Sequence, residues 1–207
     1  MFNFNVIIPD EVYQKIMYWI NKSEHEVSGF GSLDFDPESG TFKVRNAILL
    51  KQEVAPTSTE IDPLAIGKAM FELREEENAL KWHWHSHVNM SVFWSGDDKT
   101  LIKNLGSQGW IVATVFNKKY EMKSAFYGKT RTEVMGQVVD KDLFLDDIPC
   151  ATKRYLDAAL CAQWDVEYAD KVAVEKPKVG IVHKSWKSTF NEDLPVGFVK
   201  RAQRSLK

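Results

Sequence analysis

The sequence predicts an α+β domain in which a mixed central β-sheet is flanked by helices, followed by a C-terminal extension. Segments with the alternating pattern of strands and segments with the 3.6-residue pattern of helices follow one another in mixed order over about the first 140 residues. The chain has 207 residues, of which 44% are apolar, and this is enough to bury a core without disulfide support. We therefore expect one domain at 1–147 and a helical and basic extension at 148–207.

The first half of the domain is expected to begin with a strand and an amphipathic helix, followed by a β-hairpin. Apolar residues at helical spacing over 10–20 indicate the helix, and a turn-like composition at 36–40 indicates the hairpin. Gly29 and Gly31, inside the first hairpin strand, indicate a bulge or the close approach of another backbone. Residues 51–60 are expected to form a loop. Strands are expected at 2–8, 27–35 and 42–50.

The second half is expected to begin with a helix at Asp62. A carboxylate there can cap the helix, and Pro63 fits the first helical position. This helix is expected to run to about Glu77 with Met70 on its inner face, and a short helix is expected at 95–105. The remaining elements are expected to be strands at 80–87, 110–116, 120–127 and 134–140, and a last helix at 149–161.

Composition and charge exclude several classes of protein. The formal net charge of −2 gives no reason to expect a nucleic-acid partner, and no apolar run reaches the roughly 20 residues of a membrane-spanning helix. Two cysteines, Cys150 and Cys161, do not make a disulfide framework. The first residues lack the basic and apolar regions of a signal peptide. We therefore expect a cytoplasmic protein without a membrane partner.

Three of the five histidines lie close together, at His83, His85 and His87. On a strand, alternate residues face the same side, so the three imidazoles are expected on one face, with Trp82 and Trp84 on the other. Imidazole is the commonest nitrogen ligand of zinc, and two such ligands separated by one residue on a strand suit one metal ion.

A possible third ligand follows the histidines. Ser95 can cap a helix, and Asp98 then lies on the first turn of that helix, where a carboxylate is favoured. Asp98 would complete a set of two histidines and one carboxylate, which is typical of catalytic zinc sites that keep one position open for water. The spacing leaves His83 and Asp97 as alternative ligands, and Ser95 with Asp98 can also be an ordinary helix cap.

The pattern His85-x-His87, seven residues, then Ser95-x-x-Asp98 resembles the JAMM motif of the MPN-domain metallopeptidases. An upstream Glu-x-x-Gly, here Glu26 to Gly29, also resembles the family, and the order of predicted elements is similar over about two thirds of the chain. The resemblance implies an MPN fold of the cytidine-deaminase-like kind. It further implies a Zn²⁺ ion held by His85, His87 and Asp98. Val88 departs from the family, in which many members have proline after the second histidine.

The resemblance also implies the chemistry. Zinc-activated water would be the nucleophile, Glu26 the general base and Ser95 a donor to the developing oxyanion. Glu24 is the rival base, but it has no glycine three residues later. The family cleaves peptide or isopeptide bonds after the C-terminal tail of ubiquitin or a ubiquitin-like protein, so such a protein or its conjugates would be the substrate.

Two other functions are weighed against this hypothesis. One is a non-catalytic MPN scaffold, although such relatives usually lack the metal ligands that this chain has. The other is a zinc amidase that acts on a small molecule or a cell-wall peptide. The residues from Lys176 onward include eight basic and two acidic residues, together with Trp186 and Phe190. They are interpreted as an arm that contacts a protein adaptor or is simply solvated.

Overall fold

The structure is a computed structural model that describes residues 4–134, 137–152 and 158–174. These residues form four helices and thirteen short or medium strands, which confirms the α+β class. The basic arm predicted from residue 176 onward lies outside the described residues, so its contact with an adaptor stays a prediction. The helices are α1 (Asp10–Lys22), α2 (Pro63–Glu72), α3 (Gly96–Leu105) and α4 (Ala158–Lys171).

A mixed six-stranded sheet forms the centre of the fold and carries the predicted histidine strand, β8 (Trp82–Ser86), in its interior between β9 and β2. β8 runs parallel to β9 and antiparallel to β2. Because β8 has neighbours on both sides, its backbone is fixed along its whole length. In spatial order the strands are β11 (Gln137–Ile148), β10 (Met122–Val134), β9 (Trp110–Phe116), β8 (Trp82–Ser86), β2 (Ser28–Gly31) and β5 (Ile48–Leu49).

Two smaller sheets accompany the central one. The predicted hairpin over residues 27–50 is present, but it is divided between sheets, because each of its arms passes from one sheet to the other. The four-stranded sheet has the order β12 (Cys150–Ala151), β1 (Asn5–Ile7), β4 (Thr41–Val44) and β3 (Leu33–Asp36). The three-stranded sheet has the order β13 (Val172–Val174), β6 (Gln52–Ala55) and β7 (Ser58–Ile61).

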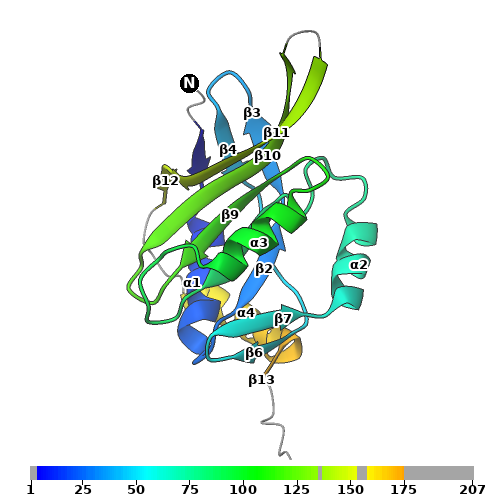
Figure 1. Ribbon diagram of the computed structural model, residues 1–207. Coiled ribbons are helices and arrows are strands. Elements are labelled where there is room, and N and C mark those ends of the chain that lie inside the picture. The colour runs from blue at the N-terminus through cyan, green and yellow to red at the C-terminus, as the bar shows by residue number, and fades with distance from the viewer. Residues whose placement is uncertain (1–3, 135–136, 153–157, 175–207) are drawn as a thin grey trace, which may run out of the picture. The chain divides into compact units, whose positions relative to one another are not determined.

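Helices cover both faces of the central sheet. The apolar face of α1 packs on the side of Trp82 and Trp84, and the Trp19 and Trp84 rings stack with centroids 5.6 Å apart. α3 packs on the opposite face of the sheet (Figure 1). Its Ile102 lies against alternate residues of β9. Burying an apolar side chain of this size contributes about 1.5–3 kcal/mol. The two faces therefore hold the histidine strand firmly from both sides.

The glycines of β2 mark a close approach, as predicted. A Cβ atom at Gly29 would lie 2.3 Å from the Ile48 carbonyl oxygen and 2.6 Å from the Trp84 ring. At Gly31 it would lie 2.2 Å from the Asn46 carbonyl oxygen. Because glycine has no side chain, β2 can lie directly against the segment that contains β5, and the Trp82 and Trp84 rings of β8 can pack over β2.

Three element predictions were wrong. Residues 51–60 contain β6 and most of β7 instead of a loop, joined by a tight turn that follows Ala55. Helix α2 ends at Glu72, short of Glu77, and Met70 is 61% exposed because the helix lies at the edge of the fold. Within the segment predicted as one helix at 149–161, residues 150–151 form β12, and α4 begins at Ala158.

Part of the predicted extension packs onto the domain. β12 pairs with β1, α4 contacts α1, and β13 pairs with β6. The compact unit accordingly spans Met1–Glu175. No helix within the described ranges is both long and apolar enough to cross a membrane.

Candidate metal centre

β8 delivers two imidazoles to the face of the sheet that α3 covers. His85 lies within the strand, in register with Ser28 of β2 and Val115 of β9, and His87 follows directly after its end. The His87 N–H donates to the Phe116 carbonyl at 2.8 Å, which continues the pairing beyond the strand. The side chains of Trp82 and Trp84 are fully buried on the α1 side, so the predicted alternation is confirmed.

The N-terminus of α3 delivers the carboxylate. Ser95 caps the helix in a reciprocal capping box: its Oγ accepts from the Asp98 N–H at 3.0 Å, and its own N–H donates to Asp98 Oδ2 at 2.8 Å. The Ser95 hydroxyl also lies 2.7 Å from Asp98 Oδ2 and donates to it. The N–H and the hydroxyl of Ser95 therefore both donate to Asp98 Oδ2, so Oδ1 is the oxygen that remains to bind a metal ion.

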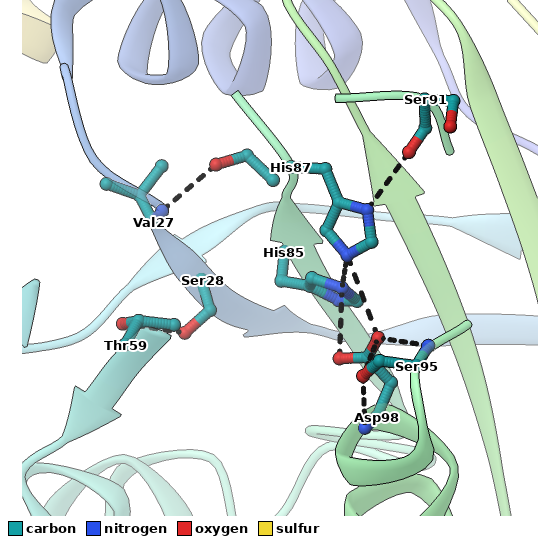
Figure 2. A network of polar contacts seen from close by, with 9 residues as sticks. Val27, Ser28, Thr59, His85, His87, Ser91, Ser95 and Asp98 are labelled. Atoms are coloured by element: carbon teal, nitrogen blue, oxygen red, sulfur yellow. Dashed lines mark hydrogen bonds and ion pairs between the residues drawn. The ribbon is translucent and has the colours of Figure 1, made fainter. Parts of the chain in front are cut away.

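Donor atoms of His85, His87 and Asp98 converge from these two elements (Figure 2). The two Nε2 atoms are 3.2 Å apart, and His85 Nε2 lies 3.3 Å from Asp98 Oδ1. Tetrahedral zinc with bonds of about 2.0–2.1 Å needs ligand atoms about 3.3 Å apart. The three side chains therefore fit a metal ion of this size, and the set of two imidazoles and one carboxylate matches what zinc takes in catalytic sites.

A hydrogen bond from the following loop sets the tautomer of His87. Its Nδ1 lies 3.1 Å from the Ser91 carbonyl oxygen, and a carbonyl can only accept, so Nδ1 carries the proton (Figure 2). In the neutral ring Nε2 then presents its lone pair to the site. Metal-bound histidines are usually oriented by such a bond.

The electrostatics favour a neutral His85 and an ionised Asp98. Burial lowers the pKa of His85 to about 4, and this effect outweighs the attraction of Asp98. Burial works against ionisation of Asp98, but the ion pair with His87, the proximity of His85 and the hydrogen bonds from Ser95 hold the pKa of Asp98 below its usual range. Both groups are therefore in the protonation state that metal binding requires.

Glu26 is the buried acid beside this cluster. It lies one residue before Val27, which exchanges hydrogen bonds with Ser86 at the end of β8: the Val27 N–H donates to Ser86 Oγ, and the Ser86 N–H donates to the Val27 carbonyl. Burial raises the pKa of Glu26 to about 7, while the charge of His87 opposes this shift. Glu24, the rival base, is exposed. Of the two acids, the structure brings only Glu26 to the site.

The alternative ligands lie outside the cluster. Asp97 is exposed on the first turn of α3, and its carboxylate is not among the converging donor atoms. His83 is buried on the same face as His85, but its ring packs against Phe30 with centroids 5.2 Å apart. Among the described residues, the donor atoms that converge come from His85, His87 and Asp98.

Zinc binding should release one proton near pH 6. Burial works against the charged form of His87, but the ion pair with Asp98, in which His87 Nε2 and Asp98 Oδ2 lie 3.7 Å apart, and the hydrogen bond to the Ser91 carbonyl raise the pKa of His87 above its ordinary value, so the ring gains a proton in mildly acidic solution. His85, with a pKa of about 4, is already neutral there. Each pH unit below the pKa of His87 should therefore weaken zinc binding about tenfold, because one proton competes with the metal. Glu26, with a pKa of about 7, would also lose its proton beside a metal ion, so the count is made on Glu26→Gln. Titration calorimetry of this variant at pH 6, in buffers of different ionisation enthalpy, counts the protons, and a count of two would contradict the assignment.

Comparisons with known proteins leave the family open. No family model matches the chain, and no curated protein matches it. Among solved structures, the chain is similar to the solution structure of protein DSY2949 from Desulfitobacterium hafniense. The identity is 13% and the TM-score 0.48, over 73% of this chain and 95% of that chain. This likeness carries no argument about function, so the functional argument depends on the site itself.

Proposed function

We propose that this protein is a zinc-dependent peptidase of the JAMM type, with an MPN fold, that hydrolyses peptide or isopeptide bonds after the C-terminal tail of a ubiquitin-like protein. The observation that carries the proposal is the convergence of His85, His87 and Asp98 beside the buried carboxyl of Glu26. A structural zinc site usually has four protein ligands. Three ligands with an acid next to them support catalysis instead.

The proposed mechanism assigns metal binding to three residues and proton transfer to Glu26. Zinc held by His85, His87 and Asp98 would lower the pKa of a water molecule to about 7 and polarise the scissile carbonyl. Glu26 would accept the proton of that water and pass it to the leaving amine, a task that suits a base with a pKa near the working pH. The raised pKa of Glu26 therefore agrees with this role.

Ser95 has a structural role at the site in addition to the oxyanion role that the motif implies. Its hydroxyl proton is directed at Asp98 Oδ2, so Ser95 orients that carboxylate and caps α3. To donate to a developing oxyanion, the hydroxyl would have to rotate away from Asp98. Its role in oxyanion stabilisation stays a prediction, while its contact with a metal-ligand candidate is direct.

A strand edge beside the site supports a tail-like substrate. β7 is the end strand of its sheet, with β6 as its hydrogen-bonded neighbour among the described strands. Its Thr59 lies 3.3 Å from the Ser28 hydroxyl, and Ser28 stands opposite His85 in the central sheet (Figure 2). An extended peptide can add to such an edge as a further strand. A C-terminal tail bound there would run next to the candidate metal ligands.

The proposal predicts a specific product. The zinc-loaded chain should convert isopeptide-linked conjugates of a ubiquitin-like protein into the free protein with a new C-terminal carboxylate, measured by intact mass. Removal of zinc with a chelator should stop the reaction, and added zinc should restore it. A zinc-loaded chain that leaves a panel of such conjugates intact would contradict the proposed substrate and favour a small-molecule or cell-wall amidase. A chain that binds no zinc would favour a scaffold.

A further inference from the structure

The turn that follows the ligand His87 has a strained backbone. Val88 has φ = 46°, in the left-handed region that β-branched residues rarely adopt. Proline, which fixes φ near −65°, cannot take this conformation. The Met90 N–H donates to the His87 carbonyl at 2.8 Å and closes the turn. Strain of this kind persists where surrounding contacts enforce it.

The enforcing contacts come from the turn between β9 and β10. The Lys118 N–H donates to the Val88 carbonyl at 2.7 Å, and Asn117 Nδ2 donates to the Met90 carbonyl at 2.8 Å. Asn117 has no exposed surface. Two carbonyls of the strained turn, one on each side of Asn89, are thus held by one neighbouring hairpin.

The orientation of the Asn117 amide is fixed by its partners. Its Oδ1 accepts from the N–H groups of Lys119 and Glu121, each at 3.0 Å. Because both of these groups can only donate, Nδ2 must face the other way, toward the Met90 carbonyl and Glu121 Oε2, which lies at 2.6 Å. The amide therefore makes four hydrogen bonds, which is its full capacity. A buried polar side chain with this bonding pattern specifies one geometry.

We propose that Asn117 is a positioning residue for the metal centre, which acts by fixing the loop whose Ser91 carbonyl orients His87. Met90 and Ser91 are consecutive, so the peptide group held by Asn117 is next to the one that accepts from His87 Nδ1. A loop that shifted here would lose that bond, and the His87 ring could turn or change tautomer. The inference rests on the proposed zinc site, and it adds a residue that does not touch the metal.

Asn117→Asp tests this with the smallest change. At pH 8 the new carboxylate can still accept from Lys119 and Glu121, but it has no proton for the Met90 carbonyl. Loss of a group that orients a metal-bound histidine typically weakens metal affinity 10–100-fold, and we expect about tenfold here. Zinc affinity is measured by chelator competition on the full chain. In the metal-free protein, the nitrogen shifts of the His87 ring should change from one tautomer to a mixture.

A second substitution separates positioning from turn stability. In Asn117→Asp the new carboxylate also faces Glu121, and this repulsion lowers the unfolding temperature. Adding Glu121→Gln removes the repulsion but leaves Met90 unpaired. The double variant should therefore regain most of the unfolding temperature and keep the weakened zinc affinity. If Asn117→Asp does not fold, Asn117→Ser replaces it in the same measurements. The serine hydroxyl can accept a hydrogen bond within the turn, but the side chain is too short to reach the Met90 carbonyl.

Two controls complete the test. Asn21→Asp makes the same chemical change on α1, where the amide donates to a carbonyl of its own helix, and Leu33→Ala destabilises the fold by removing the fully buried side chain of β3. Both should keep wild-type zinc affinity. The inference is overturned if Asn117→Asp binds zinc as tightly as wild type, if its affinity recovers together with its unfolding temperature, or if Leu33→Ala loses as much affinity. A wild-type chain that binds no zinc would instead overturn the proposed function, and unchanged ring shifts in the metal-free variant would then overturn this inference as well.

Discussion

Replacing Glu26 with glutamine is expected to lower turnover by a factor of about 10²–10⁴ while zinc stays bound, since this is the usual contribution of a general base. Glutamine keeps the shape of the side chain but cannot accept a proton from water. Glu26 lies outside the set of converging donor atoms, so its loss removes no ligand. The measurements are kcat on a cleavable conjugate and zinc content on the same preparation.

The control for this variant is close in sequence. Glu24→Gln changes an exposed acid two residues away and should leave both kcat and zinc content unchanged. Full activity of Glu26→Gln would show that another group takes the proton, and loss of zinc would show that Glu26 is a ligand.

The Glu26 variant also has a stability signature. Because burial raises the pKa of Glu26 to about 7, the folded state resists the ionised carboxyl. The carboxyl therefore lowers stability as the pH rises from about 4.5 to about 7, and this cost is fully present above pH 7. The neutral Glu26→Gln chain avoids the cost, so the metal-free variant should unfold at a higher temperature than the metal-free wild type at pH 8.

The second large effect is the loss of metal when both histidine ligands are removed. Wild-type protein is expected to contain about one zinc per chain by elemental analysis, and the double variant His85→Ala with His87→Ala should contain almost none. A site left with one carboxylate cannot hold zinc against water, because structural and catalytic zinc sites use three or four protein ligands.

His83→Gln is the matched control for the histidine variants. His83 lies two residues from His85, faces the same side and is equally buried, yet its ring packs against Phe30 outside the donor cluster. It should keep its zinc. If His83→Gln also loses zinc, the ligand set would have to be redrawn. If wild type contains none even when zinc is supplied during expression, the chain keeps the motif without the metal.

The candidate ligands could be predicted because each depends on local spacing. Alternation on a strand brings His85 and His87 to one face, and a helix cap places Asp98 on the first turn. The proximity of Glu26 was predicted only through the family resemblance, since it depends on the pairing of β2 with β8, which no local pattern encodes. Ser91 and Asn117 were missed. Ser91 acts through a backbone carbonyl, which any residue supplies, and Asn117 acts through the loop that carries this carbonyl.

The errors in the fold have physical causes as well. Residues 51–60 looked like a loop because Pro56 and several polar residues interrupt the segment, but the proline follows the last residue of β6, where it interrupts no pairing. The start of α4 was placed too early because Pro149 fits a helix start. Instead, Cys150 and Ala151 pair with β1 across the sheet. In this second case, long-range pairing prevailed over local preference.

The indole of Trp94 provides a fluorescence signal next to the candidate metal centre. Trp94 is buried, with 7% of its surface exposed, and its ring centroid lies 5.8 Å from that of His85. Its Nε1 donates to the Asp146 carbonyl at 2.9 Å. A fluorophore held rigidly beside an imidazole responds to what that imidazole binds. Substitution with Co²⁺, which quenches indole emission at short range, would let occupancy be followed in real time without labelling, whatever the substrate proves to be.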